Sequence, residues 1–205
     1  MKEKTLKLNK VQLENKERCE KYPFLIPCDW TGKPVTKRAD WNYEYTWRDD
    51  VSIGWLHLFD LMCEELLAAI EGTNCFKTFK FEEVKSKYGE LRIYEDGGNK
   101  KTAEIIRKWC FLSGYVCETC GKPDVRITNG YIAPICFECW NRFYSLDRGD
   151  YIENTNSVLY PPVLKVIKYT PSGNNKLSIN YEKDFKRLVD DWSEEFVRKY
   201  EEENV

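Results

Sequence analysis

Four of the cysteines fall into two pairs with a defined spacing. Cys117 and Cys120 form one Cys-x-x-Cys pair, Cys136 and Cys139 form a second, and 15 residues separate the two. This spacing is typical of zinc sites. A Cys-x-x-Cys turn presents two sulfurs to one ion, and two such turns complete a tetrahedron with Zn–S distances near ~2.3 Å. We therefore predict that these four cysteines bind one Zn²⁺.

The residues around the pairs predict a small module at 115–147. Asn129-Gly130 is a strong signal for a two-residue hairpin turn, with apolar residues on both sides of it. A helix carrying Trp140, Phe143 and Tyr144 is expected after the second pair. The predicted order of turn, hairpin, turn and helix corresponds to a zinc ribbon or a treble clef. Four ordinary buried or redox-active cysteines are the alternative interpretation.

The predicted zinc would be structural, because four thiolates leave no open coordination position for a substrate. The chain has a single histidine, His57, which excludes HExxH peptidases and other sites that need two histidines. A catalytic Cys–His pair would have to use this same histidine. Cys63 and Cys110 lie on apolar helix faces and are expected in the core. We therefore predict that the protein is not an enzyme.

The remaining pattern predicts an α+β fold. Helical spacing of apolar residues runs from Ser52, an expected N-cap, to about Glu71, and recurs over 102–113 and 181–203. Alternation over 76–95 predicts a β-hairpin that turns near Gly89. We divide the chain into an α+β core (1–114), the zinc module (115–147), and a C-terminal strand and amphipathic helix that pack back on the core (148–205). The last helix would dock through Phe185, Leu188, Trp192 and Phe196.

An acidic and aromatic stretch is the candidate partner surface. Eight acidic residues and one arginine lie between Asp40 and Glu71, a local net charge of −7. Within it, aromatic residues alternate in a pattern that would place them on one face of a strand. The predicted partner-binding residues are Trp41, Tyr43, Tyr45, Trp47, Asp49 and Asp50. A buried core strand and a solvated helix face are the competing interpretations.

The order of several motifs resembles a family of small phage and prophage proteins. The motifs are the segment YPFLIP at 22–27, the helix that begins at Gly54-Trp55, the segment KYGELR at 87–92, and the four-cysteine module. The resemblance covers about residues 21–140. Most members of that family have no assigned activity. The phage setting implies a protein that binds a host macromolecule, with an anti-CRISPR inhibitor among the functions to be expected.

Two functions compete on these observations. The first is a non-enzymatic inhibitor that binds a host protein, for which a CRISPR effector nuclease is the specific candidate, and blocks its loading with nucleic acid. The alternative is a nucleic-acid-binding zinc ribbon that serves transcription or replication. Acidic residues interleave with the basic ones near the cysteines, and the net charge of the chain is −2, so direct nucleic-acid binding is disfavoured. The sequence does not determine the oligomeric state.

Composition and the terminal sequence predict the location. No apolar run approaches the ~20 residues of a membrane span, and no secretory signal is visible. Nine cysteines, an odd number, fit a reducing compartment better than a disulfide framework. We therefore expect the cytoplasm of a bacterial host.

Overall fold

The computed structural model describes residues 8–29, 31–35, 41–123, 125–127, 133–143 and 179–192. These residues form a mixed α and β structure, as the sequence predicts. The helices are α1 (Lys10–Lys21), α2 (Leu56–Ile70), α3 (Lys100–Ser113), α4 (Phe137–Phe143) and α6 (Ile179–Asp191). The strands are β1 (Lys80–Lys87), β2 (Glu90–Asp96), β3 (Val125–Ile127) and β4 (Pro134–Cys136). Short 3₁₀ helices lie at Pro23–Leu25, Trp47–Asp50, Ile53–Trp55 and Asn74–Lys77.

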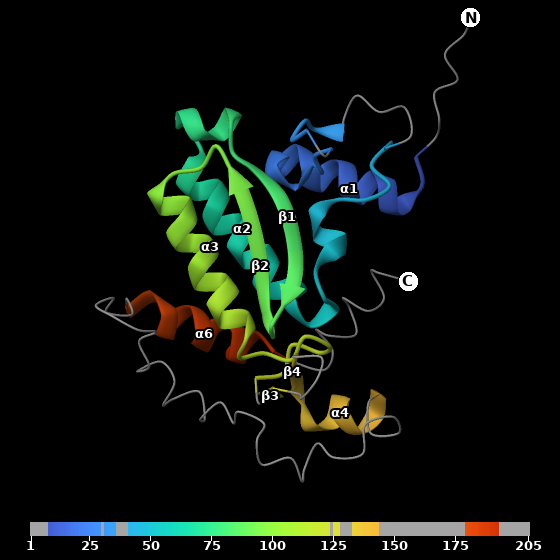
Figure 1. The fold of residues 1–205 in the computed structure, drawn as a ribbon, viewed down its shortest axis with the longest axis vertical. Coiled ribbons are helices and arrows are strands. Elements are labelled where there is room, and N and C mark those ends of the chain that lie inside the picture. The colour runs from blue at the N-terminus through green and yellow to red at the C-terminus, as the bar shows by residue number, and fades with distance from the viewer. Residues whose placement is uncertain are drawn as a thin grey trace, which may run out of the picture.

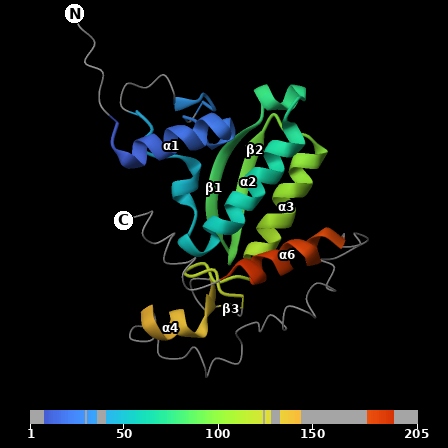
Figure 2. The same ribbon diagram turned by 180° about the vertical axis from the view of Figure 1, so that it is seen from behind.

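The main core lies between the β1–β2 hairpin and two helices. Strands β1 and β2 pair antiparallel, and α2 and α3 cover one face of the hairpin (Figures 1 and 2). The strand residues Phe81 and Leu91 are fully buried in the same apolar cluster as Phe59 of α2 and Ile105 of α3. Burial of such side chains contributes ~1.5–3 kcal/mol each. The hairpin and the two helices therefore form the most strongly packed part of the described chain.

The turn of the hairpin is where the sequence predicts it. Tyr88 and Gly89 are the two loop residues, since Lys87 pairs with Glu90 in the register. Both have positive φ, 55° for Tyr88 and 79° for Gly89, which is the backbone of a type I′ turn. Only the glycine adopts it without steric cost.

Two details of the predicted boundaries are wrong. A 3₁₀ helix at Asn74–Lys77 occupies the start of the stretch that we assigned to the hairpin. Ser52 does not cap α2: it precedes the 3₁₀ helix Ile53–Trp55 and makes no side-chain capping bond. The first α-helical residue is Leu56, and Gly72 follows the helix end in the left-handed region, with φ +74°.

The expected strand across residues 41–47 is also wrong. Asn42 and Tyr43 both have positive φ, so the chain turns there. Thr46 and Asp49 then form a capping box that starts the 3₁₀ helix Trp47–Asp50. Local side-chain capping outweighs the alternation of aromatic residues in this segment.

Helix α6 crosses the lower ends of α2 and α3 as seen in Figure 1. Its Phe185 and Leu188 are buried in the main core. Lys108 of α3, 7% exposed in its side chain, lies 2.5 Å from both Glu65 of α2 and Asp184 of α6. The ammonium group thus joins three helices. Phe196 and the expected C-terminal strand lie outside the described residues.

Candidate metal centre

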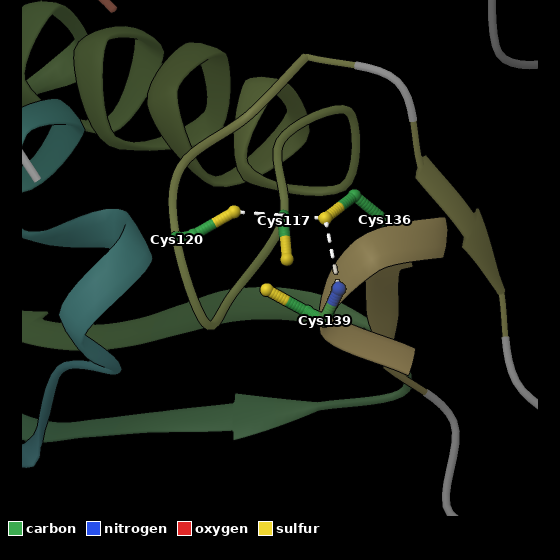
Figure 3. Close-up of side chains that lie close together, drawn as sticks. All are labelled: Cys117, Cys120, Cys136 and Cys139. Atoms are coloured by element: carbon green, nitrogen blue, oxygen red, sulfur yellow. Dashed lines mark hydrogen bonds between the residues drawn. The ribbon is translucent and has the colours of Figure 1, made fainter. Parts of the chain in front are cut away.

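The four cysteine side chains of the predicted metal site converge on one point (Figure 3). Their Sγ atoms all lie within 4.8 Å of one another, and those of Cys120 and Cys136 are 3.6 Å apart. Four sulfurs at tetrahedral Zn–S distances would be separated by about 3.8 Å. Cys117, Cys136 and Cys139 are buried, and Cys120 is partly buried. The cluster therefore has the size and the donors of a four-thiolate metal site.

The first pair is held by a tight loop between Cys117 and Lys122. The Cys117 amide donates to the Lys122 carbonyl at 2.9 Å, and the Gly121 amide donates to the Cys117 carbonyl at 2.7 Å. Gly121 has φ +73°, a conformation that favours glycine. The glycine that follows Cys120 in the sequence is therefore required by the backbone of the turn.

The second pair lies where β4 passes into α4. Cys136 is the last residue of β4, and Cys139 lies in the first turn of α4. The Cys139 amide donates to the Cys136 sulfur at 3.5 Å. Such a donor favours the ionised form of the sulfur. The Glu118 amide donates to the Pro134 carbonyl at 2.9 Å, which ties the two pairs together through the backbone.

A second, small apolar cluster surrounds the sulfurs. Val125, Ala133, Ile135 and Trp140 are buried in it together with the cysteines. Strand β3 pairs with β4 so that Val125 lies opposite Cys136. Such a small cluster leaves little apolar area to stabilise the module without a metal.

The loop of the first pair packs directly on the 3₁₀ helix Ile53–Trp55, which leads into α2. The contact involves Gly54 and Trp55, for which the sequence pattern predicts no role at the site. A Cβ on Gly54 would lie 2.1 Å from the Cys117 carbonyl oxygen and 2.6 Å from the Gly121 nitrogen. The Gly54 amide donates to the Glu118 carbonyl at 2.9 Å, and the Trp55 indole donates to the Val116 carbonyl at 3.2 Å. The sequence contains the Gly54-Trp55 dipeptide as a recognisable motif. No local pattern indicates that the Trp55 indole bonds to Val116, which lies 61 residues further along the chain.

Hydrogen bonds among the thiols shift their ionisation. Those from Cys120, Cys136 and Cys139 lower the pKa of the Cys117 thiol. A divalent cation at the centre of the cluster would be bound by the thiolate forms. Lys122, one of the basic residues that would support nucleic-acid binding, forms an ion pair with Glu138 at 2.7 Å.

The predicted partner-binding residues differ in exposure. Trp41 is 4% exposed, and its indole donates to the Tyr45 carbonyl at 2.9 Å. Trp47 is partly buried and donates to the Phe81 carbonyl at 3.0 Å. Tyr43, also partly buried, packs against the main core. Tyr45, Asp49 and Asp50 are exposed, so these three remain as the accessible part of the predicted set.

The other reactive side chains do not join the cluster. His57 lies 3.0 Å from the carboxylate of Asp191 at the end of α6. Cys63 and Cys110 are buried in the main core, as predicted. Burial raises the pKa of the Cys110 thiol to about 12, and an un-ionised thiol is a poor nucleophile.

Comparison with protein families, with curated proteins and with solved structures finds no significant match. The resemblance to phage proteins therefore stays a prediction. Among the described residues, no helix has both the length and the apolar character needed to cross a membrane.

Proposed function

We propose that Cys117, Cys120, Cys136 and Cys139 bind one Zn²⁺ in a structural site of the zinc-ribbon or treble-clef type. The convergence of the four sulfurs carries this proposal. Thiolates are soft ligands that suit zinc, and a set of four fills the tetrahedron. The metal would supply folding energy to the module and leave no position for a substrate.

The zinc proposal is tested by metal analysis of the purified protein. We expect one zinc per chain, and a clear loss of zinc and stability in Cys117→Ser. Cys75→Ser is the matched control, because Cys75 lies outside the cluster, at a partly buried position beside the main core where its sulfur accepts a bond from Asn99. Wild-type protein without zinc, or Cys117→Ser with full zinc and stability, would contradict the site.

We propose further that the protein acts by binding a partner protein and not by catalysis. The supporting observation is that four acidic or aromatic residues of one short segment, here called the acidic surface, are exposed: Glu44, Tyr45, Asp49 and Asp50. Tyrosine is frequent at binding hot spots. Carboxylates around it would steer the encounter with a basic groove on the partner.

A partner of this chemistry is a protein that itself binds nucleic acid. A CRISPR effector nuclease, which the phage resemblance suggests, carries a positively charged channel for its guide and target strands. The acidic surface would occupy such a channel and block its loading. A cytoplasmic location in a bacterial host follows from this proposal.

Binding is tested with variants of the exposed surface. Tyr45→Ala and Asp50→Lys should each weaken capture of the purified effector and restore its target cleavage. Glu71→Lys, an exposed acidic position after the end of α2, is the matched charge control. Asp49 is a poorer choice, because its carboxylate caps the Thr46 amide. Unchanged affinity in both surface variants would contradict the proposal. Tight binding of DNA by the protein alone would favour the nucleic-acid alternative instead.

A further inference from the structure

The residue after α6 contacts the loop of the first cysteine pair. The indole of Trp192 donates to the carbonyl of Cys120 at 3.0 Å. Its Cδ1 atom lies 3.7 Å from the position that a Cβ on Gly121 would occupy. The Lys122 ammonium lies 5.8 Å from the centre of its ring. The predicted docking residue Trp192 is therefore partly buried against the metal site.

A second set of contacts links the end of α6 to the segment at the start of α2, and links that segment to the cysteine loop. Asp191, the neighbour of Trp192, bonds to His57 on the first turn of α2. Three residues earlier on the same segment, Gly54 packs on the Cys117 carbonyl and on the Gly121 nitrogen. Three segments thus contact one another pairwise: the loop between Cys117 and Lys122, the segment from Gly54 to His57, and the end of α6.

The rest of α6 is attached to the main core. Phe185 and Leu188 are buried there, and Asp184 pairs with Lys108. The helix therefore bridges the main core and the loop that carries two of the four cysteines. A change in the conformation of that loop would alter the hydrogen bond between the Cys120 carbonyl and Trp192, and with it the docking of α6.

We infer that occupancy of the metal site and docking of α6 are energetically coupled. The inference rests on the proposed zinc site. A metal bound to the Cys120 sulfur fixes the backbone whose carbonyl accepts the Trp192 bond, and without a metal that loop loses its strongest restraint. Coupling of this kind is reciprocal: if the metal favours docking, then docking favours the metal by the same factor.

The forward test measures zinc affinity by competition with a chelator. Trp192→Phe keeps an aromatic side chain, although a smaller one, and removes the indole donor, so we expect about a three- to tenfold weaker affinity, the worth of one hydrogen bond. Leu188→Ala weakens docking at a position that is buried in the main core, and it should lower the affinity as well. Val189→Ala, at a position 37% exposed on the same helix, is the control and should leave the affinity unchanged.

The outcomes separate this inference from the zinc proposal. One zinc per chain with unchanged affinity in both Trp192→Phe and Leu188→Ala would overturn the coupling and leave the site standing. A chain that binds no zinc would overturn both.

The reverse test follows amide hydrogen exchange on removal of zinc. We expect the amides of α6 to exchange at least severalfold faster after chelation, with α1 unchanged as the internal control. Helix α1 is suitable because its Cys19 is buried in the main core. Equal acceleration in α1 and α6 would indicate global unfolding and would contradict a specific coupling, as would unchanged exchange in α6.

Discussion

Gly54 shows how a single residue can connect two parts of the chain. Its backbone is not in the left-handed region, so conformational freedom does not explain the glycine. The explanation is space, since the carbonyl of Cys117 and the amide of Gly121 occupy the volume where a Cβ would lie. The 3₁₀ helix Ile53–Trp55 can approach the loop between Cys117 and Lys122 only because position 54 has no side chain.

We predict that Gly54→Ala destabilises the protein by about 1–3 kcal/mol, the usual effect of overpacking, and lowers its zinc content. Denaturant unfolding and metal analysis measure the two effects. Gly114→Ala is the matched control, because there the nearest atom to a new Cβ is 3.4 Å away. Equal stability of the two variants would show that the loop can move away from α2 at little cost.

At the scale of elements, charged and polar contacts join helices that are distant in sequence. Arg48 is buried in the 3₁₀ helix Trp47–Asp50 and donates to both carboxylate oxygens of Asp60 in α2, at 2.9 and 3.0 Å. Lys108 performs the same role for α2, α3 and α6. Two of the acidic residues between 40 and 71, Asp60 and Glu65, therefore form ion pairs within the fold. Their charges contribute less to a surface that would bind a partner.

We predict that Lys108→Met destabilises the protein by about 3 kcal/mol, because it leaves the carboxylates of Glu65 and Asp184 partly buried without their cation. Chemical denaturation measures the loss. Adding Asp184→Asn to this variant should recover part of it, since one unpaired charge is then removed. A double variant less stable than the single one would argue against unpaired charge as the cause.

A substitution in the hairpin turn is expected to raise the stability of the protein. Tyr88 is 69% exposed and holds φ 55°, a conformation that asparagine tolerates better than tyrosine. We predict that Tyr88→Asn stabilises the protein by about 0.5–1 kcal/mol. The reciprocal control is Gly89→Ala, which should cost about 1–2 kcal/mol in a left-handed backbone. Thermal unfolding compares the two, and a destabilising Tyr88→Asn would show that the tyrosine ring itself contributes to stability.

At the scale of the whole molecule, the described residues form two apolar clusters of very different size. The larger one spans α1, the hairpin, α2, α3 and α6, and the smaller one surrounds the cysteines. An apolar cluster of the larger size can support a fold by itself, whereas the smaller one is of the size that a bound metal usually stabilises.

We predict that chelation of zinc splits unfolding into two steps. The cysteine module should lose its structure first, and the main core should then unfold in a separate transition at higher denaturant. Circular dichroism in the aromatic region and calorimetry follow the two steps. A single transition at the same midpoint with and without metal would mean that the metal contributes nothing to folding.

Much of this architecture could be predicted from local sequence. Two Cys-x-x-Cys pairs indicated the four residues that converge, because ligand spacing is a short-range property. Apolar periodicity located α2 and α3, and the glycine at 89 located the turn of the hairpin. In each case, residues within a few positions of one another carry the signal.

The partners of these elements were decided only by the tertiary structure. Gly54 packs on Cys117, Trp192 donates to Cys120, and Lys108 pairs with Asp184 across 76 residues. The alternation of aromatic residues over 41–47 wrongly predicts a strand, because alternation is a weak signal beside a capping box and two left-handed residues. Spacing along the chain specifies which side chains share a face of an element. Contacts between distant segments depend on close packing in three dimensions, which no local pattern encodes.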